Sequence, residues 1–257
     1  MAGMQGDDVL KALAEQHAEL DAMITGLTDE QWSRPSRCDG WSIADVLLHL
    51  VQTDEMALAS VEGRFDEYIN EAGKGLPPAT TIDDSVAALV DKHRGAPGDE
   101  IAEQWRQGST RLRDAFAATD PKARLTWVAG QMAARSLATT RLAECWIHTG
   151  DVAVGLGVPH PPTDRLWHIL RLAWRTLPYA FGRDGKEMTG PVGFDLRSPS
   201  GEQWRFADES TPPLTTITGD AAELAMVAAR RVAPSETSLH ADGPDGADVL
   251  ALIRTWA

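Results

Sequence analysis

A stripe of polar side chains on an otherwise apolar helix constrains this chain more than any other feature of its sequence. Residues 130–155 are rich in Ala, Leu, Val and Trp, which favours a helix buried on most sides. Steps of three and four residues place Arg141, Glu144, His148 and Asp151 along one face of that helix. Such a stripe either faces water or forms a site inside a helical bundle, and the rest of the sequence decides between these possibilities.

The remaining N-terminal sequence predicts the other helices of a bundle. Apolar residues recur at helical spacing over Val9–Leu27 and again over Ile101–Phe116. Between these segments, Ser42 and Asp45 form a variant capping-box pattern, which starts a third helix that carries His49. With residues 130–155, the sequence has four principal helices joined by loops of variable length, a pattern typical of a four-helix bundle.

The sequence changes character after a Pro-rich linker at residues 159–162. One further helix is expected over residues 166–177, and alternating apolar residues within 192–206 predict a β-hairpin, with more short strands and helices beyond it. We therefore predict a mainly α protein with two domains. Residues 1–160 form the four-helix bundle, and residues 161–257 form a small α+β domain.

Composition narrows the class of partner. Of the 257 residues, 43% are hydrophobic, and the formal net charge is −14 without any Lys/Arg block. An acidic surface repels phosphate backbones and anionic lipids, and no apolar run approaches the roughly 20 residues that span a bilayer. The acidic start lacks a signal-peptide pattern, and two cysteines imply no disulfide framework. We expect a cytoplasmic monomer or homodimer that binds a small molecule, not nucleic acid or a membrane.

A histidine from another helix turns the polar stripe into a candidate metal site. Glu144 and His148 alone are a common pair, which more often forms a solvated contact than a ligand set. His49, expected to face inward, adds a third N/O donor and leaves a coordination position open for water or substrate. Asp151 could orient an imidazole from behind, cap the helix end with its charge, or pair with Arg141. Arg141 could instead bind a substrate carboxylate.

Three other side chains have simpler explanations. His17 lies on an apolar stripe, which favours a core histidine bonded to a neighbour over an extra ligand or substrate contact. Cys145 is rotated by about 100° from Glu144 on a helix and is expected to be packed. Cys38 lies in a loop without a CxxC partner, which favours a structural role over a redox thiol.

Two short motifs resemble those of a known family. Cys38–Ser42 (Cys-Asp-Gly-Trp-Ser), followed by Asp45 and His49, is similar to the second-helix signature of the mycothiol-dependent maleylpyruvate isomerase family. Glu144–Asp151 resembles the same family's fourth-helix motif, Glu-x-x-x-His-x-x-Asp. These proteins belong to the DinB-like group of metal-binding four-helix bundles. The resemblance implies that His49, Glu144 and His148 bind a divalent metal, Zn²⁺ in that family, and that mycothiol serves as cosubstrate.

The resemblance extends to the C-terminal domain. In the family, an arginine at the end of a helix with the sequence Gly-Asp-Ala-Ala-Glu-Leu has been implicated in catalysis. That arginine maps to Arg230, with Arg231 as the rival, because this chain ends the helix with an arginine doublet. An arginine in this position could neutralise the carboxylate of a substrate.

The expected function is that of a metal-dependent enzyme that uses a low-molecular-weight thiol of the mycothiol type. A thiolate that adds to a conjugated double bond, followed by bond rotation and elimination, gives cis–trans isomerisation. A thiolate that displaces a leaving group gives S-transfer to a small electrophilic substrate. The alternative is a non-catalytic metal-binding or small-ligand-sensing protein built on the same bundle.

Overall fold

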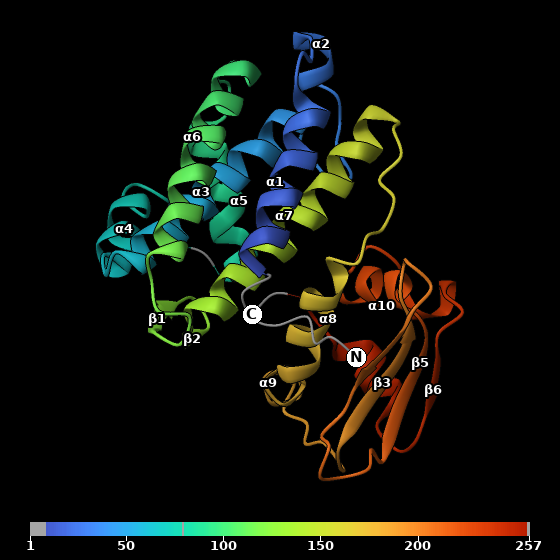
Figure 1. Cartoon of the computed structure of the whole chain (residues 1–257). Helices are drawn as coiled ribbons and strands as arrows, with labels where there is room; N and C mark the ends of the chain where they lie inside the picture. The colour runs from blue at the N-terminus through green and yellow to red at the C-terminus, as the bar shows by residue number, and fades with distance from the viewer. Residues whose placement is uncertain (1–8, 79, 256–257) are drawn as a thin grey trace. The chain divides into compact units, whose positions relative to one another are not determined.

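A computed structural model describes residues 9–78 and 80–255 of the chain (Figure 1). The structure divides into two compact units, Met1–His160 and Pro161–Ala257, and each is described below by itself. The first unit is helical apart from one short hairpin, and the second combines a four-stranded sheet with short helices. The mainly α fold class predicted from the sequence is confirmed. None of the helices in the described part of the chain has the length and apolar character needed to cross a membrane.

Four long helices form the bundle of the first unit (Figure 1). Helix α3 packs against both α6 and α7, and α1 packs against α6 and α7 from the other side. Short helices α2, α4 and α5 lie in the connections between the long ones. In chain order the helices are α1 (Val9–Ile24), α2 (Asp29–Trp32), α3 (Ile43–Val61), α4 (Phe65–Ala72), α5 (Ile82–His93), α6 (Gly98–Ala117) and α7 (Ala134–Leu156).

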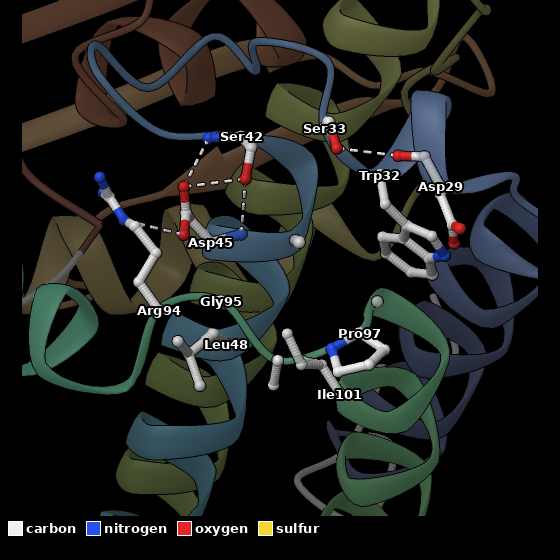
Figure 2. Close-up of a pocket in the computed structure, with 13 residues that line it drawn as sticks. Asp29, Trp32, Ser33, Ser42, Asp45, Leu48, Arg94, Gly95, Pro97 and Ile101 are labelled. Carbon is white, nitrogen blue, oxygen red and sulfur yellow. Dashed lines mark hydrogen bonds and ion pairs between the residues drawn. The ribbon is translucent and has the colours of Figure 1, made fainter.

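The start of α3 is specified by the capping box that the sequence predicted. The Ser42 hydroxyl accepts a hydrogen bond from the Asp45 backbone N–H, and the Asp45 carboxylate accepts from the Ser42 backbone N–H. Arg94 also forms an ion pair with Asp45 at 3.1 Å, as Figure 2 shows. Because each bond satisfies a group that the first helical turn leaves unpaired, the helix begins at a defined residue. A defined start fixes which face of α3 carries His49.

Helix α7 starts later than the sequence predicted, because a short β-hairpin lies directly before it. Strands β1 (Arg124–Trp127) and β2 (Gly130–Ala133) pair in antiparallel register directly before the helix. Leu125 and Trp127 are buried while the residues between and before them are exposed, so this segment alternates as a strand does. The helix therefore begins at Ala134 instead of near residue 130. It ends at Leu156, and the next residue, Gly157, terminates the helix with its left-handed φ of 70°.

The second unit is built on a mixed sheet with the strand order β4-β3-β5-β6. The predicted hairpin is confirmed, because β3 and β4 pair antiparallel, whereas β5 pairs parallel to β3. Helices α8, α10 and α11 pack against this sheet. The elements are α8 (Leu166–Arg175), α9 (Leu177–Arg183), β3 (Val192–Arg197), β4 (Gln203–Phe206), β5 (Thr215–Asp220), α10 (Ala221–Ala228), the 3₁₀ turn η2 (Pro234–Glu236), β6 (His240–Asp242) and α11 (Gly246–Leu252).

Helices α8 and α9 replace the single helix expected over residues 166–177. The chain leaves helical geometry at Thr176, and Pro178 occupies the first turn of the next helix. Proline lacks a backbone N–H and is tolerated in a first turn, where no intrahelical partner exists. A second helix, α9, therefore begins at Leu177, with Pro178 in its first turn. The apolar periodicity of the sequence predicted that the helical segment would end there.

Candidate metal centre

Three donor atoms from two helices of the bundle converge on one point. His49 extends from α3, and Glu144 and His148 extend from α7 one turn apart. Nε2 of His49 lies 3.2 Å from Oε2 of Glu144, and Nε2 of His148 lies 3.6 Å from the same oxygen. The three candidate ligand atoms lie within 4.8 Å of one another. The structure thus brings together the three residues that the sequence analysis grouped.

This donor set fits a divalent transition metal. In a tetrahedral site with N and O donors about 2.0–2.2 Å from the ion, neighbouring donors lie about 3.3–3.6 Å apart, close to the two separations above. Two imidazoles with one carboxylate suit zinc and similar ions better than Ca²⁺ or Mg²⁺, which prefer oxygen ligands. The Glu144 side chain is 18% exposed and those of the two histidines 8% and 10%, so the carboxylate is the most accessible member.

Burial and hydrogen bonding set the charge of the three residues. Burial opposes ionisation of Glu144, but hydrogen bonds from His148 and His49 prevail and hold its pKa well below the ordinary value. Burial would also lower the pKa of His148, but hydrogen bonds to Asp151, Cys38 and Glu144 raise it well above normal. For His49, burial dominates and lowers the pKa. The pocket therefore favours a carboxylate at Glu144 and positive charge beside it.

Asp151 lies behind His148, on the side of the ring away from Glu144. Its Oδ2 is 2.9 Å from Nδ1 of His148, while Nε2 of the same ring points toward Glu144. Asp151 is 1% exposed, and Cys38 donates a second hydrogen bond to the same carboxylate oxygen at 3.2 Å. A carboxylate that accepts the Nδ1 proton fixes the tautomer and orientation of a ligating imidazole. The contact of Asp151 follows from the helical spacing in the sequence, whereas that of Cys38 depends on how a loop packs against α7.

Arg141 is committed to the bundle core. Its Nε donates to Asp54 Oδ1 at 2.9 Å and its Nη2 donates to the Thr53 hydroxyl at 2.8 Å, with the arginine only 1% exposed. Asp54 lies on α3, so the ion pair joins α3 to α7. These contacts give Arg141 a structural role in the bundle. Its ion-pair partner is Asp54, not Asp151 as the sequence suggested. A role of Arg141 toward substrate stays a prediction.

His17 lies on α1 and is not among the three converging donors. Arg113 donates to its Nδ1 at 2.5 Å, and the Trp105 ring packs edge-on against it. Burial and the charge of Arg113 lower the pKa of His17 to about 3. His17 is therefore a neutral core histidine bonded to a neighbour, the first of the two interpretations of its apolar stripe.

Arg230 lies in the second unit, after Ala229, which caps the end of α10. It adopts a left-handed conformation with a φ of 60°, and it is the only residue other than glycine with a positive φ in the described ranges. Its backbone N–H donates to Val227 and that of Arg231 donates to Met226, which closes the end of α10. Arg230 is exposed, and burial of part of the side chain together with the charge of Arg254 lowers its pKa. Its catalytic role stays a prediction.

A cavity of about 420 Å³ lies elsewhere in the first unit, between α2, α3 and the start of α6 (Figure 2). Its wall combines the apolar side chains of Trp32, Leu48 and Ile101 with the charged pair of Asp45 and Arg94. Both charged groups already have partners, since Asp45 caps α3 and pairs with Arg94. None of the three candidate metal ligands lines this cavity.

Comparison with known proteins identifies the family. The family model described as the mycothiol maleylpyruvate isomerase N-terminal domain matches residues 13–153. Uncharacterized proteins from two strains of Mycobacterium tuberculosis are each 32% identical over 248 residues, covering 95% of this chain and 93% of theirs. The crystal structure of the mycothiol-dependent maleylpyruvate isomerase is similar in fold, with a TM-score of 0.60 at 16% identity, over 95% of this chain and 96% of that one. The chain therefore belongs to the mycothiol maleylpyruvate isomerase family.

Proposed function

We propose that this protein is a divalent-metal-dependent enzyme that activates a low-molecular-weight thiol of the mycothiol type. The reaction would be isomerisation of a small electrophilic substrate or S-transfer to it. One observation carries the proposal, namely the convergence of His49, Glu144 and His148 inside a bundle of this family. Zn²⁺ is the metal that the donor set suits and that the family resemblance implies.

The charge of the donor set supports thiol chemistry. Metal binding requires both imidazoles to be neutral, and His148 would release its extra proton when the ion binds. With Glu144 ionised, the three donors then carry one negative charge in total. A divalent ion bound there would retain one positive charge, which favours a coordinated thiolate over the thiol at neutral pH. Asp151 would hold the Nδ1 proton of His148, so that Nε2 keeps its lone pair for binding.

The two candidate reactions differ in what happens to the thiol. In isomerisation the sulfur adds to a conjugated double bond, a single bond rotates, and elimination returns the thiol unchanged. In S-transfer the sulfur displaces a leaving group, and the thiol is consumed. Analysis of the thiol by mass spectrometry after turnover therefore distinguishes the reactions without knowledge of the physiological substrate.

The first experiment measures metal content. Elemental analysis of the purified protein should give about one equivalent of divalent metal per chain, and His49→Ala and Glu144→Gln should lose most of it. His93→Ala is the matched control, because His93 lies in the same unit on an exposed part of α5. Wild-type protein without bound metal, and unable to bind added Zn²⁺, would refute the proposal.

The second experiment measures turnover of the metal-loaded protein. Mycothiol is combined with maleylpyruvate to test isomerisation, and with an electrophile that carries a leaving group to test S-transfer. Activity that requires both thiol and metal supports the proposal. Tight binding of metal and thiol without turnover of either class would instead identify the alternative, a metal-binding or ligand-sensing protein.

A further inference from the structure

We propose that Cys38 is a positioning residue of the metal site, whose thiol holds Asp151 and thereby the ligand His148 in place. This inference rests on the proposed metal site. Sγ of Cys38 donates to Oδ2 of Asp151 at 3.2 Å, and the same oxygen is 2.9 Å from Nδ1 of His148. Sγ also lies 3.9 Å from Nδ1 of His148, a longer contact than its bond to Asp151, so the thiol supports the imidazole chiefly through that carboxylate.

The loop before α3 is built to deliver this thiol. The Ser36 hydroxyl accepts a hydrogen bond from the Cys38 backbone N–H at 3.1 Å and donates to the Trp41 carbonyl at 2.9 Å. The Trp41 backbone N–H donates back to the Cys38 carbonyl at 3.0 Å. The loop is also tied to α7, because the Arg37 backbone N–H donates to the Asp151 carbonyl at 3.2 Å. Hydrogen bonds at the Cys38 N–H and carbonyl, and at the N–H of the preceding residue, therefore fix the backbone that carries the thiol.

The direction of the hydrogen bond follows from the chemistry of the pair. An ionised carboxylate carries no proton and can only accept, so the Cys38 thiol donates to Asp151, which is 1% exposed. A buried carboxylate that loses a donor becomes less well solvated and more free to rotate. Rotation of Asp151 would release the Nδ1 proton of His148 from its acceptor, and the imidazole would lose its fixed orientation.

A second metal ion at Cys38, Asp151 and His148 is the competing interpretation, since their donor atoms also lie within 4.8 Å of one another. Both candidate groups share His148, which offers Nε2 to one and Nδ1 to the other. An imidazole that binds a metal through Nε2 normally keeps its proton on Nδ1. That proton is the one that Asp151 accepts, so the group behind His148 acts as a hydrogen-bonded support.

The same loop also contacts the other imidazole ligand. The Trp41 ring packs against His49 with the ring centroids 5.4 Å apart. Nδ1 of His49 is buried and has no hydrogen-bond partner within the described part of the chain. Apart from their contacts with Glu144, His49 is therefore held by packing and His148 by hydrogen bonds, and one short loop supplies a side chain to each arrangement.

The test compares Zn²⁺ affinity, measured by competition with a chromophoric chelator, in wild type, Cys38→Ala and Cys38→Ser. Removal of a group that is hydrogen-bonded to a metal-ligating side chain typically costs 10–100-fold in affinity. Because Cys38 acts chiefly through Asp151, its loss should weaken Zn²⁺ binding by about threefold to tenfold. Serine keeps an O–H donor and should restore most of the affinity. Cys145→Ser is the matched control, because that thiol lies on α7 and bonds only to Gln16 and Thr149 in the described contacts.

A double variant separates positioning from a general loss of stability. If Cys38 acts through Asp151, then Cys38→Ala should have no further effect on Zn²⁺ affinity in an Asp151→Asn background. The visible absorption of bound Co²⁺ should also change in Cys38→Ala and recover in Cys38→Ser. Thermal unfolding of the metal-free variants checks that each is folded, and Cys38→Val provides a second variant without a donor if the alanine variant is not.

The outcomes distinguish this inference from the function on which it rests. Weaker binding in Cys38→Ala, with recovery in Cys38→Ser and no added effect beside Asp151→Asn, supports the positioning role. Equal Zn²⁺ affinity in wild type and Cys38→Ala would overturn it while leaving the metal site intact. A wild-type protein that binds no Zn²⁺ would overturn the proposed function first and this inference with it.

Discussion

Acidification should destabilise the first unit through His17, a residue outside the metal site. Arg113 donates to Nδ1 of His17, and the imidazole is only 4% exposed. Protonation at Nδ1 would remove the acceptor of this hydrogen bond and place two positive charges side by side in the bundle. The folded protein therefore resists protonation of His17, whereas the unfolded chain does not.

The size of the effect follows from the two pKa values of His17. The pKa falls from an ordinary value of 6.5 to about 3 in the folded protein. Because the folded pKa lies below the unfolded one, the stabilising contribution is complete above pH 6.5. It decreases as the pH falls, by about 1.4 kcal/mol per unit. Between about pH 8 and about pH 5 the loss amounts to roughly 2 kcal/mol.

The assay is urea unfolding followed by tryptophan fluorescence, with Trp105 in contact with the His17 ring as an internal probe. His17→Gln serves as the reference, because its amide oxygen can accept from Arg113 but does not titrate. The free energy of unfolding of wild type should fall by roughly 2 kcal/mol more than that of His17→Gln between these pH values. Equal pH dependence of the two proteins would refute the reasoning.

Four further variants test the packing and the backbone. Asp54→Ala leaves the buried Arg141 unpaired, so the free energy of unfolding should fall by about 3–5 kcal/mol in urea titrations. Gly155→Ala should lower the melting temperature, because its Cβ would lie 2.7 Å from a backbone oxygen, whereas the helical Gly108→Ala meets nothing within 4 Å and should raise it. Arg230→Gly should raise the stability by about 1 kcal/mol by relieving the left-handed residue, and turnover should fall if this arginine is catalytic.

The candidate ligand set could be predicted because the sequence determines, for both helices, which face carries the ligands. The capping box of Ser42 and Asp45 sets the start of α3 and hence the face on which His49 lies. On α7, the spacing of four residues places Glu144 and His148 one turn apart whatever the exact ends of the helix. The convergence of α3 and α7 then follows from the bundle fold.

The partners of the buried charges could not be predicted, because they depend on how the helices are rotated against one another. Arg141 meets Asp54 across 87 positions of sequence, and His17 meets Arg113 across 96. Apolar periodicity identifies the buried face of each helix but not which polar residues of two faces meet. The contact of Cys38 with the site is unpredictable for the same reason, since it arises from a loop packed on α7.

Arg141 shows how the core of the bundle limits the charge of the site. Its guanidinium lies close enough to His49 to lower the pKa of that imidazole, after burial and the neighbouring His148. An uncompensated cation there would repel a metal ion, and the Asp54 carboxylate cancels most of that field at short range. Asp54→Ala should therefore weaken Zn²⁺ binding as well as stability.

The double variant Asp54→Ala/Arg141→Met decides whether charge or packing causes this loss. It removes both charges and keeps an apolar side chain of similar length in the core, so the buried cation no longer opposes the metal. Zn²⁺ affinity should then return toward the wild-type value in chelator competition. If the affinity stays as low as in Asp54→Ala, the ion pair supports the site through the geometry of α3 and α7, and the electrostatic explanation is wrong.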